Sequence, residues 1–431
     1  MADIQKELSY WEIQALSGPW DFVVVGAGVT GLHAAIEIKR QQPRLQVLIL
    51  ESRTLGAVAS TRNAGFLCLG SPSELQEDWT QLGENGLMEL LSAKWAGIQR
   101  TLHLLGGKAI GLRNVLGYEV FARGNSRFAQ AIPHHESVLP ILPRLNEIMA
   151  QASNFPIPFI PKQRKNESIK DKSRHTPYFG DWKPFHGLNP VNPSNWGPDA
   201  SGCIPIAWEG QVNPFLLRES LLRYARNLGI RVQEGLQVTK TGTNILSVVP
   251  ASPKPDYKYN LKTNLLDIKL KSIIYATNAL TCNLLSNLSP GIIPQRGQMW
   301  ASAALNPVDL ARLNGNFHAD RGYLYYRTQQ GRLLLGGGRN QDFASEQTDE
   351  WSENQLISNY LKSYSVEVLG LPENMEWESR WSGTMGFTVS GLPQCRQLQD
   401  GEWLVAGMNG MGMALGPEMG RRVACMALQA F

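Results

Sequence analysis

Short apolar runs alternate with helix-like segments along most of the chain, a pattern typical of an α/β fold. The first run, Phe22–Val25, is followed by a helical segment and a second run, Val47–Leu50, which ends at Glu51. Further short runs predict strands at 230–232, 236–238, 268–270, 273–275 and 403–406. Apolar residues three and four positions apart predict helices over 213–229 and 351–370.

Other parts of the chain have different patterns. Segments at 298–303, 323–328 and 333–336 predict an antiparallel sheet, with a hairpin turn at 329–331. Residues 74–150 are expected to be mainly helical. Residues 155–200, rich in Pro, Asn, Ser, Lys and Trp, predict a long irregular insertion. A glycine-rich turn after residue 406 leads to a last helix, from about Met413 to Gln429.

The glycines after the first apolar run predict a dinucleotide-binding turn. Gly26 allows a sharp turn, Gly28 lets the backbone approach a pyrophosphate, and Gly31 lets the next helix pack closely on the strand. The N-terminus of that helix offers N–H groups and a positive dipole end to the phosphates. Glu51, twenty positions after Gly31, suits the hydroxyls of an adenosine ribose. The motif alone leaves both FAD and NAD open.

Composition limits the classes of protein to consider. The 431 residues are 43% hydrophobic with a mean hydropathy of −0.22, which favours two globular domains. No apolar stretch has the length of a membrane span, and we expect no signal peptide. Five scattered cysteines without a Cys-x-x-Cys pair predict no disulfide framework, no metal site and a cytoplasmic location.

The net charge of +4 has a local origin. Between residues 162 and 174, six positive and two negative side chains leave a balance of +4, so the rest of the chain is neutral. We expect a solvated loop there, with docking of an anionic substrate or a redox partner as the alternative. The chain lacks a broader basic surface with interleaved aromatic residues, so no nucleic acid is expected as a partner.

Five stretches together resemble the D-amino-acid oxidase-like FAD-dependent oxidoreductases, which include glycine oxidase and sarcosine oxidase. They are residues 26–51, 60–65, 294–298, 325–338 and 407–420. Residues 381–393 are most similar to the γ-glutamylputrescine oxidase branch. The resemblance implies an α/β plus α+β fold, in which a Rossmann-like FAD-binding domain of glutathione-reductase type carries an inserted domain of antiparallel sheet and helices. We assign 1–80, 201–288 and 381–431 to the FAD-binding domain, and 81–200 and 289–380 to the substrate domain.

The resemblance also implies FAD as the cofactor. Gly383 stands where sarcosine oxidases carry the cysteine that tethers FAD, so we expect non-covalent binding. The ADP half is assigned to Gly26, Gly28, Thr30, Gly31, Glu51, Ser52 and Arg53, with Val238 at the adenine end and Ala276 and Thr277 beside the turn. The ribityl chain and flavin ring are assigned to Ser60, Thr61, Arg62, Asn63, Ala64, Gly65, Phe66, Gly407, Gly410, Met411, Gly412 and Met413. A helix N-terminus at residues 410–413 suits the negative charge of a reduced flavin.

The implied substrate site lies on the sheet over the flavin. The candidate catalytic residues are Tyr323, Tyr325, Arg327, Trp381 and Met385, the first three of which share one face of a strand. Aromatic faces attract an alkylammonium by ~0.5–2 kcal/mol. Met385 stands where glycine oxidase-like proteins carry the arginine that binds the substrate carboxylate, and Leu334 where sarcosine oxidases carry an oxygen-activating lysine. Substitutes for the missing arginine are Arg321, Arg327 or Arg339.

We therefore expect an FAD-dependent oxidoreductase that oxidises the C–N bond of a small-molecule amine or amino acid. Hydride passes to flavin N5, the imine hydrolyses, and O2 (giving H2O2) or another electron acceptor reoxidises the flavin. One alternative is a dehydrogenase of a hydroxy acid or polyol phosphate. The other is a non-catalytic flavin-binding protein. The substrate, the choice of acceptor and the formation of a homo-oligomer are left open.

Overall fold

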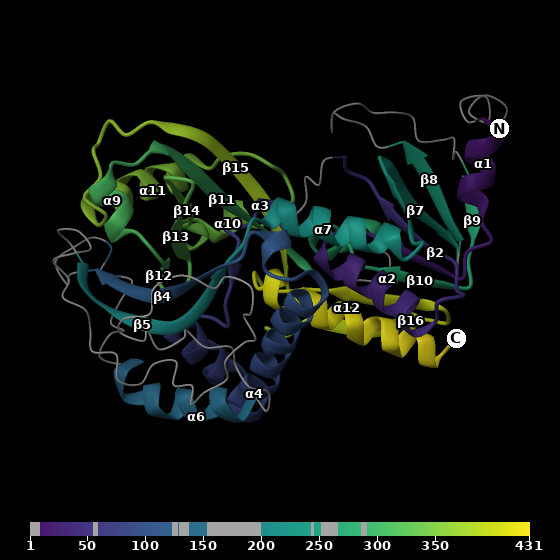
Figure 1. The fold of residues 1–431 in the computed structure, drawn as a ribbon, viewed down its shortest axis with the longest axis horizontal. Coiled ribbons are helices and arrows are strands. Elements are labelled where there is room, and N and C mark those ends of the chain that lie inside the picture. Colours follow the sequence, from purple (N-terminus) through teal and green to yellow (C-terminus); the bar gives the residue numbers. More distant parts are fainter. Residues whose placement is uncertain are drawn as a thin grey trace, which may run out of the picture.

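The computed structural model describes residues 9–54, 59–122, 128, 138–152, 200–242, 245–250, 266–285 and 291–431. Two sheet-containing regions lie side by side, with the ends of the described chain at the right of the view (Figure 1). The basic stretch at 162–174, and with it nearly all of the predicted insertion, lies outside the described residues. None of the helices in the described ranges combines the length and apolar character needed to cross a bilayer.

One region is built on a six-stranded sheet in the order β16–β17–β10–β1–β2–β6. Every neighbouring pair is parallel except β16 and β17. The strands are β1 (Phe22–Val25), β2 (Val47–Glu51), β6 (Arg231–Glu234), β10 (Ser272–Tyr275), β16 (Gln394–Gln399) and β17 (Glu402–Ala406). All residues of β1, β2, β10 and β17 are buried, as their uninterrupted apolar runs predict. The predicted Rossmann-like arrangement is confirmed.

Helices and a small sheet complete this region. The helices are α1 (Tyr10–Ser17), α2 (Val29–Gln41), α3 (Ala59–Arg62), α7 (Pro214–Asn227), α8 (Thr281–Leu284) and α12 (Gly412–Gln429), with a 3-10 turn η5 (Asn278–Leu280). A three-stranded sheet is formed by β7 (Leu236–Gly242), β8 (Ile245–Pro250) and β9 (Leu266–Lys269). Leu246 and Val248 of β8 share a buried cluster with Val23 and Val25 of β1.

The second region is an eight-stranded sheet in the order β15–β11–β14–β13–β12–β4–β5–β3. Its strands are β3 (Phe66–Leu67), β4 (Arg113–Ala122), β5 (Ala200–Gln211), β11 (Ile293–Ala304), β12 (Asn316–Ala319), β13 (Leu324–Gln329), β14 (Arg332–Gly337) and β15 (Trp377–Phe387). All pairs are antiparallel, as predicted, except β4 with β12, which is parallel. Ile357 and Leu361 of α11 (Gln355–Glu367) share a buried cluster with Phe317, Tyr326 and Leu335 of this sheet. Shorter elements are α9 (Pro307–Arg312), α10 (Phe343–Glu346) and the 3-10 turn η7 (Arg339–Gln341).

The expectation of a mainly helical segment at 74–150 is confirmed for most of the described residues, but it missed a strand. Residues 72–105 and 142–152 form α4 (Pro72–Leu105) and α6 (Leu142–Ala152), with 3-10 turns η1 (Lys108–Ile110) and η3 (Leu139–Ile141), but β4 lies between them. The first four residues of β4 are exposed or half-buried, so the strand shows little alternation of apolar and polar positions. Its place in the sheet comes from pairing with β5 and β12, both distant in sequence.

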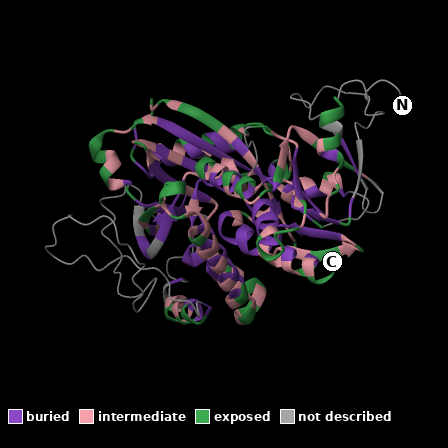
Figure 2. Ribbon diagram, turned by 45° about the vertical axis from the view of Figure 1, so that its right-hand side comes forward, coloured by how far each residue is buried: buried purple, intermediate pink, exposed green. Residues whose placement is uncertain are grey.

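The eight-stranded sheet takes strands from both of the proposed domains. β3 and most of β5 come from residues assigned to the FAD-binding domain, whereas β4 and β11 come from residues assigned to the substrate domain. The division into two domains therefore stays a proposal. Buried residues occur in both sheets and in α2 and α12 (Figure 2).

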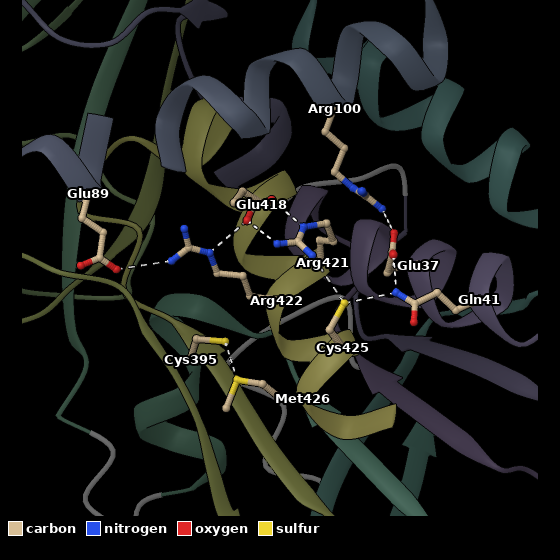
Figure 3. A network of polar contacts seen from close by, with 10 residues as sticks. All are labelled: Glu37, Gln41, Glu89, Arg100, Cys395, Glu418, Arg421, Arg422, Cys425 and Met426. Atoms are coloured by element: carbon tan, nitrogen blue, oxygen red, sulfur yellow. Dashed lines mark hydrogen bonds and ion pairs between the residues drawn. The ribbon is translucent and has the colours of Figure 1, made fainter. Parts of the chain in front are cut away.

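A polar network ties α2, α4 and α12 together (Figure 3). Glu37 of α2 pairs with Arg100 of α4. Gln41 of α2 donates to Cys425 Sγ of α12 at 3.2 Å, and Arg422 of α12 pairs with Glu89 of α4 at 3.7 Å. The helices approach closely because small residues stand at their contacts. A Cβ on Gly97 of α4 would lie 1.8 Å from the carbonyl oxygen of Ala414 in α12. This packing fixes the N-terminus of α12.

Candidate active site

The turn between β1 and α2 has the shape of a dinucleotide cradle. Gly26 has a φ of +105°, and a Cβ there would lie 2.7 Å from the carbonyl oxygen of Ala276. A Cβ on Gly31 would lie 2.0 Å from the carbonyl oxygen of Gly26. Gly28 differs, because a Cβ there would approach only the Ser60 hydroxyl, at 3.1 Å. Packing thus explains Gly26 and Gly31, whereas Gly28 leaves room for a ligand that approaches the backbone.

The N-terminus of α2 and the end of β2 complete the cradle. No side chain caps α2 at Gly28, and its first turn holds no acidic residue, although Val29 N donates to Ser60 Oγ at 3.0 Å. Glu51 is buried, and its carboxylate accepts hydrogen bonds from Ala27 N and Arg53 N, both at 2.9 Å. These bonds hold the carboxylate beside the turn with acceptor positions to spare for a ribose diol.

Residues 59–66 lead from the cradle into the second region. The Asn63 side chain donates to the carbonyl oxygens of Ala59 and Ser60, both at 3.0 Å, and accepts from Gly65 N at 2.8 Å. Gly65 has a φ of +76°, and a Cβ there would lie 2.4 Å from Val212 O. The chain is thus held in one turn, which brings residues 62–66 to a shared cavity.

The turn after β17 reaches the same cavity from the other side. Gly407 and Gly410 have φ values of +78° and +83°, and Asn409, with a φ of +48°, donates through its backbone N to Gly386 O at 3.0 Å. α12 begins at Gly412 without a side-chain cap or an acidic residue in its first turn. Its positive dipole end therefore lies beside Met411 and Met413, which line the cavity.

A cavity of about 470 Å³ lies between these two turns and the eight-stranded sheet. The predicted site residues that line it are Arg62, Asn63, Ala64, Gly65, Phe66, Tyr323, Tyr325, Met385, Gly410, Met411 and Met413. They come from four separate parts of the chain, so the fold brings the proposed flavin-ring segment and the proposed substrate strand together. Burial raises the pKa of Tyr325 to about 12, which keeps its phenol protonated at neutral pH.

Two of the candidate catalytic residues lie behind this lining. Arg327 is buried and donates to Val212 O at 2.9 Å, because its strand continues past the end of the cavity. Trp381 donates through Nε1 to Arg62 O at 3.0 Å and so supports the 59–66 turn. Neither residue is among those that line the cavity. Direct contact of either with a substrate stays a prediction.

The remaining predicted cofactor residues surround the cradle. Ser52 lies next to Glu51, and the Arg53 guanidinium stacks over Trp351 at 3.7 Å from the ring centroid. The Thr277 and Thr281 hydroxyls share a hydrogen bond of 2.9 Å. Thr30 faces Gly416, Thr61 is in α3, Val238 is in β7, and Gly407 and Gly412 flank the last turn. Contacts of these residues with the cofactor stay predictions.

Comparison with known proteins identifies the family. Residues 21–134 and 187–426 match the model of a family described as FAD dependent oxidoreductase. The chain belongs to this FAD-dependent oxidoreductase family. Its cofactor is FAD, and the cradle, the acidic residue after β2 and the uncapped α12 are the features that fit FAD. Membership of the γ-glutamylputrescine oxidase branch stays a prediction.

Relatives of this oxidoreductase cover nearly its whole length. It is 23% identical over 414 residues to a probable oxidoreductase, OrdL, of Rhizobium meliloti (strain 1021), covering 95% of this chain and 83% of the relative. The fold is similar to glycine oxidase from Geobacillus kaustophilus, with a TM-score of 0.65, 19% identity and 95% of each chain covered. It is also similar to L-proline dehydrogenase from P. horikoshii, with a TM-score of 0.66, 14% identity and 96% and 94% covered.

The oxidoreductase also carries a buried charged cluster that the sequence did not reveal. His318 Nε2 lies 2.8 Å from Glu209 Oε1, and His318 Nδ1 lies 3.5 Å from Glu74 Oε2. Burial disfavours charge on the imidazole, but the two carboxylates outweigh it and raise the pKa of His318 well above its usual range. Burial likewise opposes ionisation of Glu74, yet His318 and Ser71 N lower the pKa of Glu74 to about 2. Only the Ser71–Glu74 capping box has a local sequence signal.

Cys68 lies beside this cluster and lines the cavity. Ligand atoms of Cys68, Glu209 and His318 all lie within 4.8 Å of one another, an arrangement that is able to hold a metal ion. The His318–Glu209 ion pair accounts for the grouping without one, and the absence of a metal stays a prediction. Burial and the carboxylates of Glu209 and Glu74 raise the pKa of the Cys68 thiol well above its usual value. A protonated thiol is a poor nucleophile, which supports non-covalent FAD.

The low pKa of Glu74 predicts a loss of stability in acid. The ordinary value is 4.5 and the folded value is about 2, so this contribution is present above pH 4.5 and is lost as the pH falls from 4.5 towards 2. We expect Glu74→Gln to lower the thermal midpoint at pH 6 and to flatten its decline below pH 4.5. Thermal unfolding of both proteins across this range measures the effect.

A control on the same helix separates loss of the Glu74–His318 pair from the unspecific effects of low pH on stability. Glu89→Gln removes an exposed carboxylate of α4 and should leave the profile unchanged. Burial raises the pKa of Glu119 to about 7. Between pH 4.5 and 7, Glu119 therefore changes the stability in the direction opposite to Glu74, so the variants are compared below pH 4.5. Identical profiles for Glu74→Gln and the unmodified protein would contradict the assignment.

Proposed function

We propose that this FAD-dependent oxidoreductase oxidises the C–N bond of an amino acid or related amine bound in the cavity. The bound flavin supplies the two-electron acceptor. The surrounding side chains bind and orient the substrate, and the uncapped N-terminus of α12 provides positive electrostatic potential at the cavity wall. The products are the reduced cofactor and an imine, which water hydrolyses to a carbonyl compound and a free amine or ammonia.

The observation that carries the proposal is that each carboxylate in the described lining of the cavity has a cationic partner. Glu74 pairs with His318 and Glu77 with Arg321, both at 3.5 Å, and Asp78 pairs with Lys94 at 3.3 Å. Oxidation of an alcohol needs a base that removes the hydroxyl proton as hydride leaves. An amine that has lost its ammonium proton to solvent before the reaction needs none, because the nitrogen lone pair then assists the loss of hydride.

His318 is the other basic group to consider. Its pKa is raised well above the usual range by Glu209 and Glu74, so the ring already carries both protons at neutral pH and is a poor acceptor. The paired carboxylates and the protonated imidazole together favour an amine over a hydroxy acid or a polyol phosphate.

Aromatic residues on the cavity wall also favour an amine. Tyr323, which directly precedes β13, and Tyr325 of β13 line the cavity together with Phe387 of β15. Aromatic faces attract a cationic or partly positive nitrogen, and the two phenols offer polar groups for orientation. Two proteins of similar fold, the glycine oxidase and the L-proline dehydrogenase, are named for amino-acid substrates. One is an oxidase and the other a dehydrogenase, so the electron acceptor is a separate question.

Anaerobic titration of the purified yellow holoprotein tests the proposal. The panel contains D- and L-amino acids, N-alkyl amino acids and γ-glutamyl amines, with 2-hydroxy acids and glycerol phosphate as matched oxygen compounds. We expect an amino compound to bleach the flavin band near ~450 nm while its hydroxyl analogue does not. Bleaching by the oxygen compounds alone, or by no compound, would overturn the proposal. Admitting air afterwards separates an oxidase, which recolours rapidly, from a dehydrogenase.

A further inference from the structure

We infer that the substrate carries a carboxylate and that Arg339 binds it. This inference rests on the proposed function and makes it more specific, because it selects amino acids over simple amines. Met385 on β15 lines the cavity but carries no charge that would bind a carboxylate. Arg339 enters the same cavity from a different element, the 3-10 turn that follows β14.

Three aromatic rings hold the Arg339 side chain in place. Its guanidinium carbon lies 4.3 Å from the ring centroid of Phe387, 4.9 Å from that of Tyr323 and 5.4 Å from that of Phe343. Gly338, with a φ of +80°, turns the chain immediately before Arg339. Rings stacked on a guanidinium cover its faces and leave its N–H edge for a ligand in the same plane.

Arg339 differs from the other cations of the cavity in having neither a counterion nor a hydrogen-bond acceptor among the described residues. Arg321 pairs with Glu77, and Lys94 with Asp78. Arg62 donates to Ser382 O and stacks at 4.0 Å over Trp351, on the side of the 59–66 turn.

This charge balance decides the kind of ligand. Glu74, Glu77 and Asp78 are already neutralised by three cationic partners, so a second ammonium group of a diamine would meet no free acid. The unpaired charge that remains at the substrate side is positive. A half-buried cation costs free energy until an anion reaches it, and burial already lowers the pKa of Arg339. A carboxylate matches the guanidinium with two parallel hydrogen bonds.

A binding experiment that needs no turnover tests the inference. The probes are phenylacetate and phenylacetamide, which have the same shape but differ in charge, and binding to the holoprotein is followed by calorimetry. We expect the unmodified protein to bind phenylacetate about tenfold or more tightly than phenylacetamide. Arg339→Met should abolish this preference, and Arg339→Lys, which keeps the charge but loses the planar fork, should retain part of it.

Joint replacement by Arg321→Met and Glu77→Gln provides the matched control. The two residues line the same cavity as an ion pair, so their joint loss leaves the net charge of the cavity unchanged and should leave the preference for phenylacetate intact. The flavin absorbance of each variant confirms that FAD is retained. Equal binding of the two probes to the unmodified protein, binding of neither, or a preference that survives Arg339→Met would overturn the inference.

The result is distinguishable from failure of the proposed function. If Arg339 governs carboxylate binding but no amino compound reduces the flavin, the inference holds and the proposed function fails. If an amine without a carboxylate reduces the flavin equally well in Arg339→Met and in the unmodified protein, the proposed function holds and the inference fails.

Discussion

Replacing Gly31 with alanine should yield a protein that is strongly destabilised and purifies with little FAD. The added Cβ would lie 2.0 Å from the carbonyl oxygen of Gly26 and 3.2 Å from the Cβ of Ala276. The first contact lies within the β1–α2 turn and the second is with the residue that follows β10, so the strain is relieved only if α2 moves away from the sheet. Overpacking of this kind costs about 1–3 kcal/mol or more. Flavin absorbance per chain and the thermal midpoint measure the two effects.

Gly28→Ala is the informative comparison. Its Cβ would approach only the Ser60 hydroxyl, at 3.1 Å, so the fold should tolerate the change. The new methyl group would occupy the space through which a pyrophosphate approaches the backbone. We expect near-normal stability of the apoprotein and FAD affinity weakened by about tenfold or more. If Gly28→Ala binds FAD normally, this turn is not the pyrophosphate site; if Gly31→Ala folds and binds FAD normally, the packing argument is wrong.

Loss of the buried Arg296–Glu346 ion pair should have the second large effect. Arg296 Nη2 and Nε lie 2.6 Å and 3.1 Å from the two oxygens of Glu346, whose side chain is fully buried. Glu346→Ala leaves the guanidinium unpaired in the interior, which costs about 3–5 kcal/mol. The free energy of unfolding in urea is the measurement.

Glu346→Ala should also weaken the binding of FAD, because the Arg296–Glu346 pair fixes the segment that contains Trp351. Arg296 also donates to Ser352 Oγ and, at 3.5 Å, to Glu350 O. Trp351, between these residues, is the ring on which Arg53 and Arg62 stack. Glu346→Ala should therefore also speed the release of FAD.

Two further variants keep this prediction falsifiable. Glu378→Ala removes an exposed partner of Arg332 and should cost only about 0–1 kcal/mol. Joint replacement by Arg296→Met and Glu346→Leu removes both charges and should recover much of the stability. Equal losses in Glu346→Ala and Glu378→Ala would show that burial does not decide the cost.

The sequence predicts well the parts of the site that are local. The cradle at 26–31 depends on glycines next to a strand and a helix, and the turn before α12 depends on glycines at 407, 410 and 412. In both cases the residues that form the site are close in sequence to the residues that position it. The alternation of residues 323 and 325 likewise predicts correctly that both tyrosines face one cavity.

The parts that escaped prediction depend on contacts between distant segments. Glu209 and His318 meet only because β5 and β12 lie on either side of β4 in the eight-stranded sheet. β4 itself lacks a clear alternating pattern. Arg327 follows the same alternation as Tyr323 and Tyr325, and the sequence therefore predicts that all three face the cavity. Alternation shows which face of a strand a side chain is on, but not how far along the strand the cavity extends. Arg327 lies behind the cavity lining for this reason.

The most direct test of C–N oxidation is the stoichiometry of one turnover with whichever amino compound reduces the flavin. Substrate consumed, carbonyl compound formed, and amine or ammonia released are measured against the electron pairs taken up by the acceptor. The account predicts a ratio of one to one to one to one, because hydrolysis of the imine releases the nitrogen. A reduced flavin with the nitrogen retained in the product, or oxidation of a hydroxyl group on the same molecule, would contradict it.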